Sequence, residues 1–176
     1  MIAVVDFIGN VVKTASLLTQ KEIGKEVFYQ YGHIREINET LTSYSKTEEF
    51  RKQKYPAIFL LQDFAEKMGI DEQYETKVSL QLLIVSGSAT EYRSADRYEK
   101  VFKPILYPIY SNFIKSLGQN PDLMKSYNGF PHEKIDRPLV SGALVETTKG
   151  VANLFNDNLD AIEIRNLNLI ILKKCI

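Results

Sequence analysis

The sequence predicts an α/β fold of the α+β type, in which a long curved helix and an N-terminal helix pack on a mixed or antiparallel β-sheet. Two stretches carry this prediction. In KVSLQLLIVS, at residues 77–86, apolar and polar side chains alternate, and the second half is apolar on both faces, as in a central strand that is covered on both sides. In residues 94–117, apolar side chains recur at three- and four-residue steps, which is typical of an amphipathic helix.

The predicted long helix contains two prolines, Pro104 and Pro108, that lie off its apolar stripe. Each proline deletes one backbone hydrogen bond and pushes its own side of the helix outward, so we expect the helix to curve around the sheet. We also expect Leu82 to face Ile105, or near neighbours of either, across the interface between sheet and helix. The stripe consists of Tyr98, Val101, Phe102, Ile105, Leu106, Ile109, Phe113 and Ile114.

The N-terminal part of the chain predicts a helix, a strand and a second, shorter helix. Apolar residues at helical spacing in residues 4–18 indicate an amphipathic helix. Alternation in residues 27–31 indicates a strand that ends at Gly32, and residues 34–41 again show helical steps, although a hairpin is an alternative there. Residues 43–54 are polar and of mixed charge, so we expect an exposed loop.

The middle of the chain predicts another strand and a long loop. Pro56 precedes the apolar run AIFLLQDF, which we interpret as a strand, because proline is tolerated at the first position of a strand. Residues 66–76 form a polar turn region. Residues 118–142 contain three prolines and no sustained periodicity, so we expect an irregular excursion within the one domain.

The C-terminal run AIEIRNLNLIILKK predicts a long last strand. Ile162 and Ile164 share one parity, whereas the apolar residues from Leu167 onward share the other. The switch around Arg165 and Asn166 predicts a β-bulge or a bend.

Length and composition limit the class of protein. The 176 residues suit a single domain, and the 22 basic and 22 acidic residues give zero net charge, so the composition does not predict a phosphate-neutralising face. Cys175 is the only cysteine, which fits a reducing compartment. No apolar run approaches the ~20 residues of a membrane-spanning helix. The start of the sequence also lacks the basic region of a signal peptide, so we expect a soluble intracellular protein with no membrane partner.

The chemical motifs of common enzymes are missing from the sequence. It contains no GxxxxGK phosphate loop, no GxGxxG fingerprint and no GxSxG elbow. Gly87 and Ser88, between the predicted strand and helix, could offer backbone amides to an anion, but an ordinary turn is the better interpretation. His33 and His132 have no metal-type partner at close spacing. Residues 156–160 resemble the start of a calcium loop, but Ala161 stands where that loop requires glycine. We therefore expect no catalytic residues, no cofactor and no metal.

Tyrosine is unusually frequent, with 10 tyrosines and no tryptophan. Tyrosine favours protein interfaces, because its ring buries apolar area while its hydroxyl keeps a polar partner. Base stacking is the alternative, but surfaces that stack bases normally interleave basic residues with the aromatic ones. The candidate interface consists of Tyr29, Tyr31, Glu163, Arg165 and Asn166.

The ordered pattern of segments resembles a known group of proteins. FYQYGHIREINETL is followed by KYPAIFLLQDF, by EYRSADRYEKVFKPILYPIYSNFIKSL and by NLFNDNLDAIEIRNLNLII. Over residues 27–171 the chain resembles prophage-encoded proteins found beside tail and head-completion genes in gut bacteria. More distantly, it is similar to the tail-terminator and neck proteins of long-tailed bacteriophages. The excursion at residues 118–142 is longer than in the simplest members of that group.

This resemblance implies a structural assembly protein that forms a homo-oligomeric ring, commonly a hexamer. Such a ring terminates the tail tube and joins it to the head connector, so the implied partners are other copies of the chain, the tail tube and the head-connector proteins. The implied location is the host cytoplasm during assembly and then the tail or neck of the virion. No sequence-specific nucleic-acid partner is expected.

Two other classes remain open from the sequence. One is a small α/β domain that binds a ligand or nucleic acid without catalysis. A basic face for nucleic acid would draw on Lys46 and residues 51–54, although Glu48 and Glu49 interrupt it. The other class is an enzyme, which would show clustered carboxylates or an anion site near Gly87.

Overall fold

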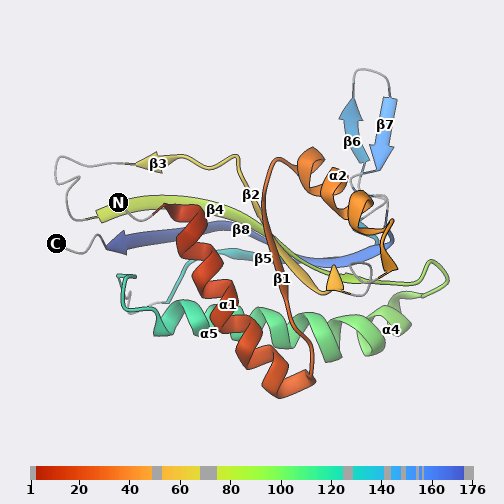
Figure 1. The fold of residues 1–176 in the computed structure, drawn as a ribbon, viewed down its shortest axis with the longest axis horizontal. Helices are drawn as coiled ribbons and strands as arrows, with labels where there is room; N and C mark the ends of the chain where they lie inside the picture. Colours follow the sequence, from red (N-terminus) through yellow and green to blue (C-terminus); the bar gives the residue numbers. More distant parts are fainter. Residues whose placement is uncertain are drawn as a thin grey trace.

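A computed structural model describes residues 3–48, 53–67, 75–124, 129–140, 144–147, 150–153, 155 and 157–172. The main sheet has the strand order β1 (Phe28–Gly32), β2 (Ala57–Leu61), β4 (Glu75–Gly87), β8 (Leu159–Leu172) and β5 (Glu133–Arg137), and β3 (Glu66–Lys67) pairs with β4. Among the described strands of this sheet, only β1 and β2 run parallel, and the other pairs are antiparallel. The predicted α+β class with a mixed sheet is therefore confirmed, and β4 is its central strand (Figure 1).

Helices cover one face of the sheet along its whole length (Figure 1). α1 (Val4–Ile23) crosses a long helical run made of α4 (Ser94–Arg97), η1 (Tyr98–Leu106) and α5 (Tyr107–Gln119). Leu82 is fully buried in the core that these helices share with β4 and β8, and Ile105 is partly buried against the same core. α1 ends at Gly24, which adopts φ 69° and donates its backbone N–H to the carbonyl of Gln20.

In the described part of the chain, the opposite face of the sheet is covered over only part of its length. α2 (Ile34–Tyr44) contributes Ile37 and Leu41 to a second core. These side chains belong to one cluster with Phe59 of β2, Leu83 of β4 and Phe155, all of which are buried. The end of β4 is thus covered on both faces, as its sequence predicts. Toward its beginning, Lys77 and Ser79 are exposed on the side away from the helices.

The long helix is not a regular α-helix throughout. Residues Tyr98–Leu106 form a π-helical segment that contains Pro104, and α5 then begins with Pro108 at its second position. A proline cannot donate a backbone hydrogen bond and collides with the carbonyl one turn earlier, so a wider hydrogen-bonding pattern is a physically reasonable response. The π segment also shifts the phase of the apolar stripe. Tyr98, which the α-helical spacing places on the stripe, is 47% exposed.

The bulge predicted in the last strand is confirmed. Leu80 of β4 pairs with Leu167, and Leu82 pairs with Ile164, so β8 has one extra residue between these two positions. Asn166 lies in the extra segment and adopts φ 52°, a conformation that asparagine tolerates better than most residues. β8 pairs with β4 along its whole length, and its bulge turns the apolar side chains of both halves toward the core.

Several loops predicted from polar composition contain regular structure. Within residues 118–142, Glu133–Arg137 forms the edge strand β5, and within residues 66–76 the short β3 pairs with β4. Both strands have exposed polar side chains, so they carry no apolar alternation for the sequence to reveal. α2 extends to Tyr44, and Lys54, expected in an exposed loop, is buried where its Nζ donates to Asp157 Oδ2.

β6 (Leu144–Thr147) and β7 (Gly150–Asn153) form a separate two-stranded antiparallel sheet. Figure 1 shows this hairpin standing away from the main sheet, above α2. Neither strand pairs with a strand of the main sheet in the part of the chain that the structure describes.

Candidate functional site

The two tyrosines of the candidate interface lie in the edge strand β1 but have different surroundings. Tyr29 is half-buried against α1, where its O–H donates to the carbonyl of Val5 at 3.0 Å. Burial, followed by the charges of Tyr31 and Asp6, raises the pKa of Tyr29 well above its usual value. A Cβ at Gly9 would lie 3.1 Å from Cε1 of Tyr29, so glycine allows the ring to approach the helix. Tyr29 therefore fastens β1 to α1.

Tyr31 is 50% exposed, and its ring centroid lies 6.4 Å from that of Tyr29. The backbone groups of Tyr31 point the same way as those of Tyr29. Phe28 donates its N–H to Pro56, and the carbonyl of Gly32 accepts from Gln62, so alternate residues of β1 bond to the β2 side. The N–H and C=O of Tyr31 consequently point to the outer side of β1, which has no partner strand among the described residues.

The other edge of the sheet is formed by β5, whose outer side also has no partner strand in the described part of the chain. Its polar side chains contact the long helix. Tyr107 donates its O–H to Asp136 Oδ2 at 2.7 Å, and this hydrogen bond, followed by burial, raises the pKa of Tyr107 to about 12. Lys134 Nζ lies 4.6 Å from the ring centroid of Tyr107 and 5.6 Å from that of Tyr110, a cation–π arrangement.

Glu163, expected at an interface, is 4% exposed and lies beside Leu83 on the face of the sheet that α2 partly covers. Its Oε2 accepts from Arg137 at 2.7 Å, and its Oε1 accepts from Arg165 at 2.6 Å and from the Gln81 amide at 2.7 Å. Burial by itself would raise the pKa of Glu163, but the hydrogen bonds from Arg165 and Arg137 prevail and lower it. Glu163 thus joins β4, β8 and β5 and is not available to a partner.

Arg165 and Asn166 lie at the bulge of β8, and they differ in exposure. Arg165 is partly buried and its guanidinium is held by Glu163, whereas Asn166 is exposed and donates weakly, at 3.4 Å, to Glu133 Oε1. Of the five predicted interface residues, the structure places Tyr29 and Tyr31 together at one edge. It places Glu163, Arg165 and Asn166 beside the other edge strand, β5.

The sequence did not indicate a buried ion pair that joins the start of the long helix to the start of β8. Arg97 Nη1 donates to Asp160 Oδ1 at 2.6 Å, and the two side chains are 4% and 0% exposed. Ser88 lies between them, accepting from Arg97 and donating to Asp160 Oδ2. The Ser88 hydroxyl of the Gly87–Ser88 turn is thus hydrogen-bonded to both members of this pair. The spacing contained a hint of this burial. Arg97 lies four residues before Val101, so helical geometry places Arg97 on the same face as the apolar stripe.

The two histidines have structural partners. His33 is the N-cap of α2, where its Nδ1 accepts from the N–H of Arg35 while Glu36 accepts from the N–H of His33. The Nε2 of His132 is hydrogen-bonded to the hydroxyl of Tyr110 at 2.8 Å. Among the residues that the structure describes, no group of three or more histidine, cysteine, aspartate and glutamate side chains could hold a metal ion. Cys175 lies outside the described residues.

A cleft of about 460 Å³ adjoins the start of β1, with Lys25, Glu26, Gln53 and Tyr55 among the residues that line it.

Within the described ranges, no helix combines the length and apolar character needed to cross a bilayer. No protein-family model matches the chain, and no curated protein sequence matches it significantly.

Proposed function

We propose that this protein is a structural assembly protein of a phage or prophage tail, which forms a ring that terminates the tail tube and joins it to the head connector. The observation that carries the proposal is that, among the described strands, the sheet has two different edges without a partner, β1 and β5, at its opposite ends. An open edge is a template for pairing with another chain. When the β5 edge of one copy meets the β1 edge of the next, the contact is head-to-tail, and such contacts close into a ring if the rotation permits.

The β6–β7 hairpin supports the same proposal. An isolated two-stranded hairpin is marginally stable in water and usually needs a further surface to pack on. This hairpin pairs only with itself among the described strands and stands away from the body of the domain (Figure 1). A neighbouring copy in the ring, or the tail tube, would supply a surface that the hairpin does not find in the strands that the structure describes.

The charge balance is compatible with this role. The 22 basic and 22 acidic residues leave no net repulsion between copies that pack side by side. On this proposal the protein acts without catalysis in the host cytoplasm during assembly and stays in the neck of the virion. Its partners are other copies, the tail tube and the head-connector proteins.

The direct test is to delete the gene from its prophage, induce the prophage and image the particles by electron microscopy. We expect overlong, irregular tails or tails that are not joined to heads, and we expect the wild-type gene supplied in trans to restore normal particles. Normal tails firmly joined to filled heads in the deletion strain would refute the proposal.

A further inference from the structure

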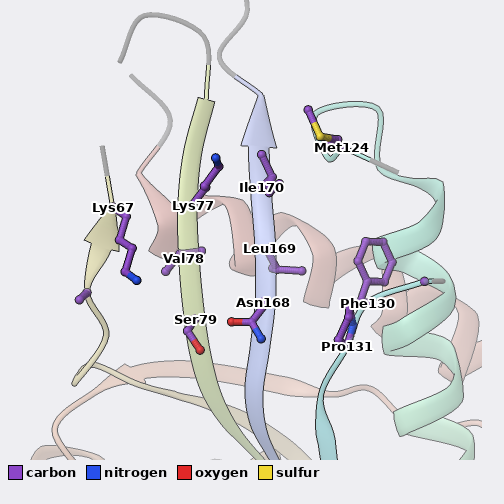
Figure 2. Close-up of a pocket in the computed structure, with 12 residues that line it drawn as sticks. Lys67, Lys77, Val78, Ser79, Met124, Phe130, Pro131, Asn168, Leu169 and Ile170 are labelled. Carbon is purple, nitrogen blue, oxygen red and sulfur yellow. The ribbon is translucent and has the colours of Figure 1, made fainter. Parts of the chain in front are cut away.

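A cavity of about 660 Å³ lies on the face of the sheet opposite α1 and α5, over the part that α2 leaves uncovered. Figure 2 shows its three sides. β4 and β8 form the floor, on which Ser79 and Asn168 are register partners. Lys67 of β3 and Lys77 of β4 lie along one side, and Met124, Phe130 and Pro131 lie along the other. Its volume is within the ~300–1,000 Å³ that is typical of small-molecule sites.

The basic side of the cavity has an unusual cross-strand pair. Lys67 and Lys77 are direct register partners in the antiparallel β3–β4 pair, so their side chains leave the sheet on the same face. Like charges at directly opposed positions are destabilising. Glu75 Oε1 lies 3.0 Å from Lys77 Nζ and neutralises only that lysine, because Lys67 has no ion pair within the described residues. Of the two lysines, Lys67 therefore leaves this side of the cavity with a positive charge that no described carboxylate balances.

The opposite side of the cavity is apolar. Met124 is 43% exposed, although a methionine normally lies in the interior. Phe130 is partly buried, with part of its ring against the core, and Pro131 and Ile170 complete the apolar lining. The described residues that line the cavity include two lysines and no carboxylate. The cavity is therefore positive on one side and apolar on the other.

We propose that this cavity binds a small amphiphilic carboxylate, namely an aliphatic acid of medium chain length. The carboxylate lies between Lys67 and Lys77, within reach of the Ser79 hydroxyl as a further donor. The aliphatic chain crosses the floor of the sheet and packs against Met124 and Phe130. This arrangement matches the charge of each side and covers the exposed methionine, and it does not depend on ring formation, because the cavity is built within one chain.

The test is to titrate the full-length protein with decanoate by calorimetry and by NMR. Three other compounds serve as comparison probes. Decanol has the same tail and no charge, acetate has the carboxylate head alone, and decyltrimethylammonium has the same tail with the opposite charge. We expect saturable binding of decanoate that is about tenfold or more tighter than that of decanol, because the hydrogen bonds to the carboxylate are charge-assisted. Added salt should weaken the binding of decanoate and leave that of decanol unchanged.

Variants locate the site. Lys67→Gln combined with Lys77→Gln should lower the affinity for decanoate by about tenfold and leave the affinity for decanol unchanged. Lys13→Gln combined with Lys115→Gln removes the same charge from exposed positions on α1 and α5 and should have no effect. Met124→Asp should lower the affinity for decanoate further than for acetate, and thermal melting checks that each variant is folded.

Three results would overturn the proposal. The first is the absence of saturable decanoate binding at millimolar concentration. The second is equal affinity for decanoate and decanol, and the third is an equal loss of affinity in the two double-lysine variants.

Discussion

Arg97 and Asp160 form an ion pair that is almost completely closed to solvent, with Arg97 Nη1 at 2.6 Å from Asp160 Oδ1. Asp160 is fully satisfied there, because it also accepts from the Ser88 hydroxyl and from the N–H of Leu139. Arg97 in turn donates to the carbonyls of Tyr92 and Ala89. The pair thus joins the loop after β4, the start of the long helix and the start of β8.

Removal of one member of this pair should be strongly destabilising. Asp160→Ala leaves a buried guanidinium without its counter-charge, which typically costs about 3–5 kcal/mol. Urea denaturation of the wild type and the variant measures the loss. As a control, the combination of Arg97→Met and Asp160→Leu should recover much of the stability, because it removes both charges. A loss below about 1 kcal/mol for Asp160→Ala would contradict the burial of the pair.

Leu82 tests the central position of β4. It is fully buried between β4 and the helices, so Leu82→Ala should reduce the free energy of unfolding by about 2–5 kcal/mol. Leu17→Ala provides the matched control, because Leu17 is 55% exposed on α1 and its truncation should change stability by less than about 0.5 kcal/mol. A loss as small as that of the control in denaturant titration would show that β4 is not the centre of the core.

The stability contributed by Glu163 should depend on pH. Its folded-state pKa is lowered, so its contribution is present above the unfolded pKa of about 4.3 and is lost as the pH falls through the folded pKa. At pH 7, Glu163→Gln should cost about 1.5–3 kcal/mol, because the hydrogen bonds from Arg137 and Arg165 lose their charge assistance. Denaturation at a series of acidic pH values should show the two proteins converging. A constant difference over that range would contradict the assignment.

Tyr31 tests the β1 edge as a contact in the proposed ring. Tyr31→Pro removes an N–H that points away from β2, and proline is accepted at such edge positions, so the domain should still fold. Supplied in trans to the deletion prophage, this variant should fail to restore normal tails. Tyr31→Thr removes the ring but keeps the N–H and is the matched control. Full restoration by Tyr31→Pro would exclude β1 as a pairing edge.

The core elements could be predicted from the sequence because each of them buries one periodic apolar face. β4, α1 and the long helix all follow this rule, and the parity switch in the last strand located its bulge. β5 could not be found in this way, because EKIDR has one apolar residue and is held by pairing with β8 instead of by burial. The π-helical segment was also not predicted. The prolines indicate that the helix is distorted, but they do not indicate which hydrogen-bonding pattern the distorted segment adopts.

The five residues of the candidate interface have different surroundings in the structure, and the sequence could not distinguish them. Tyrosine content led to the prediction of an interface, but only the topology shows that Tyr29 and Tyr31 lie in an edge strand, where Tyr31 is half-exposed and Tyr29 is hydrogen-bonded to α1. Glu163 looked like a surface residue because charged residues are rarely buried. Its two arginine partners come from β5 and β8, and their convergence depends on a strand pairing that the sequence does not reveal.

The partial cover of the sheet gives β4 two different environments along one strand. Residues 83–85 lie between two apolar layers, whereas residues 77–79 have the helices on one side and the cavity on the other. Amide hydrogen exchange reads such a difference directly, since local opening needs less free energy where fewer contacts must break. Amides near Leu83 should exchange only through global unfolding, and those near Lys77 through smaller fluctuations. A single strand would then report both the opening of the cavity and the unfolding of the whole domain.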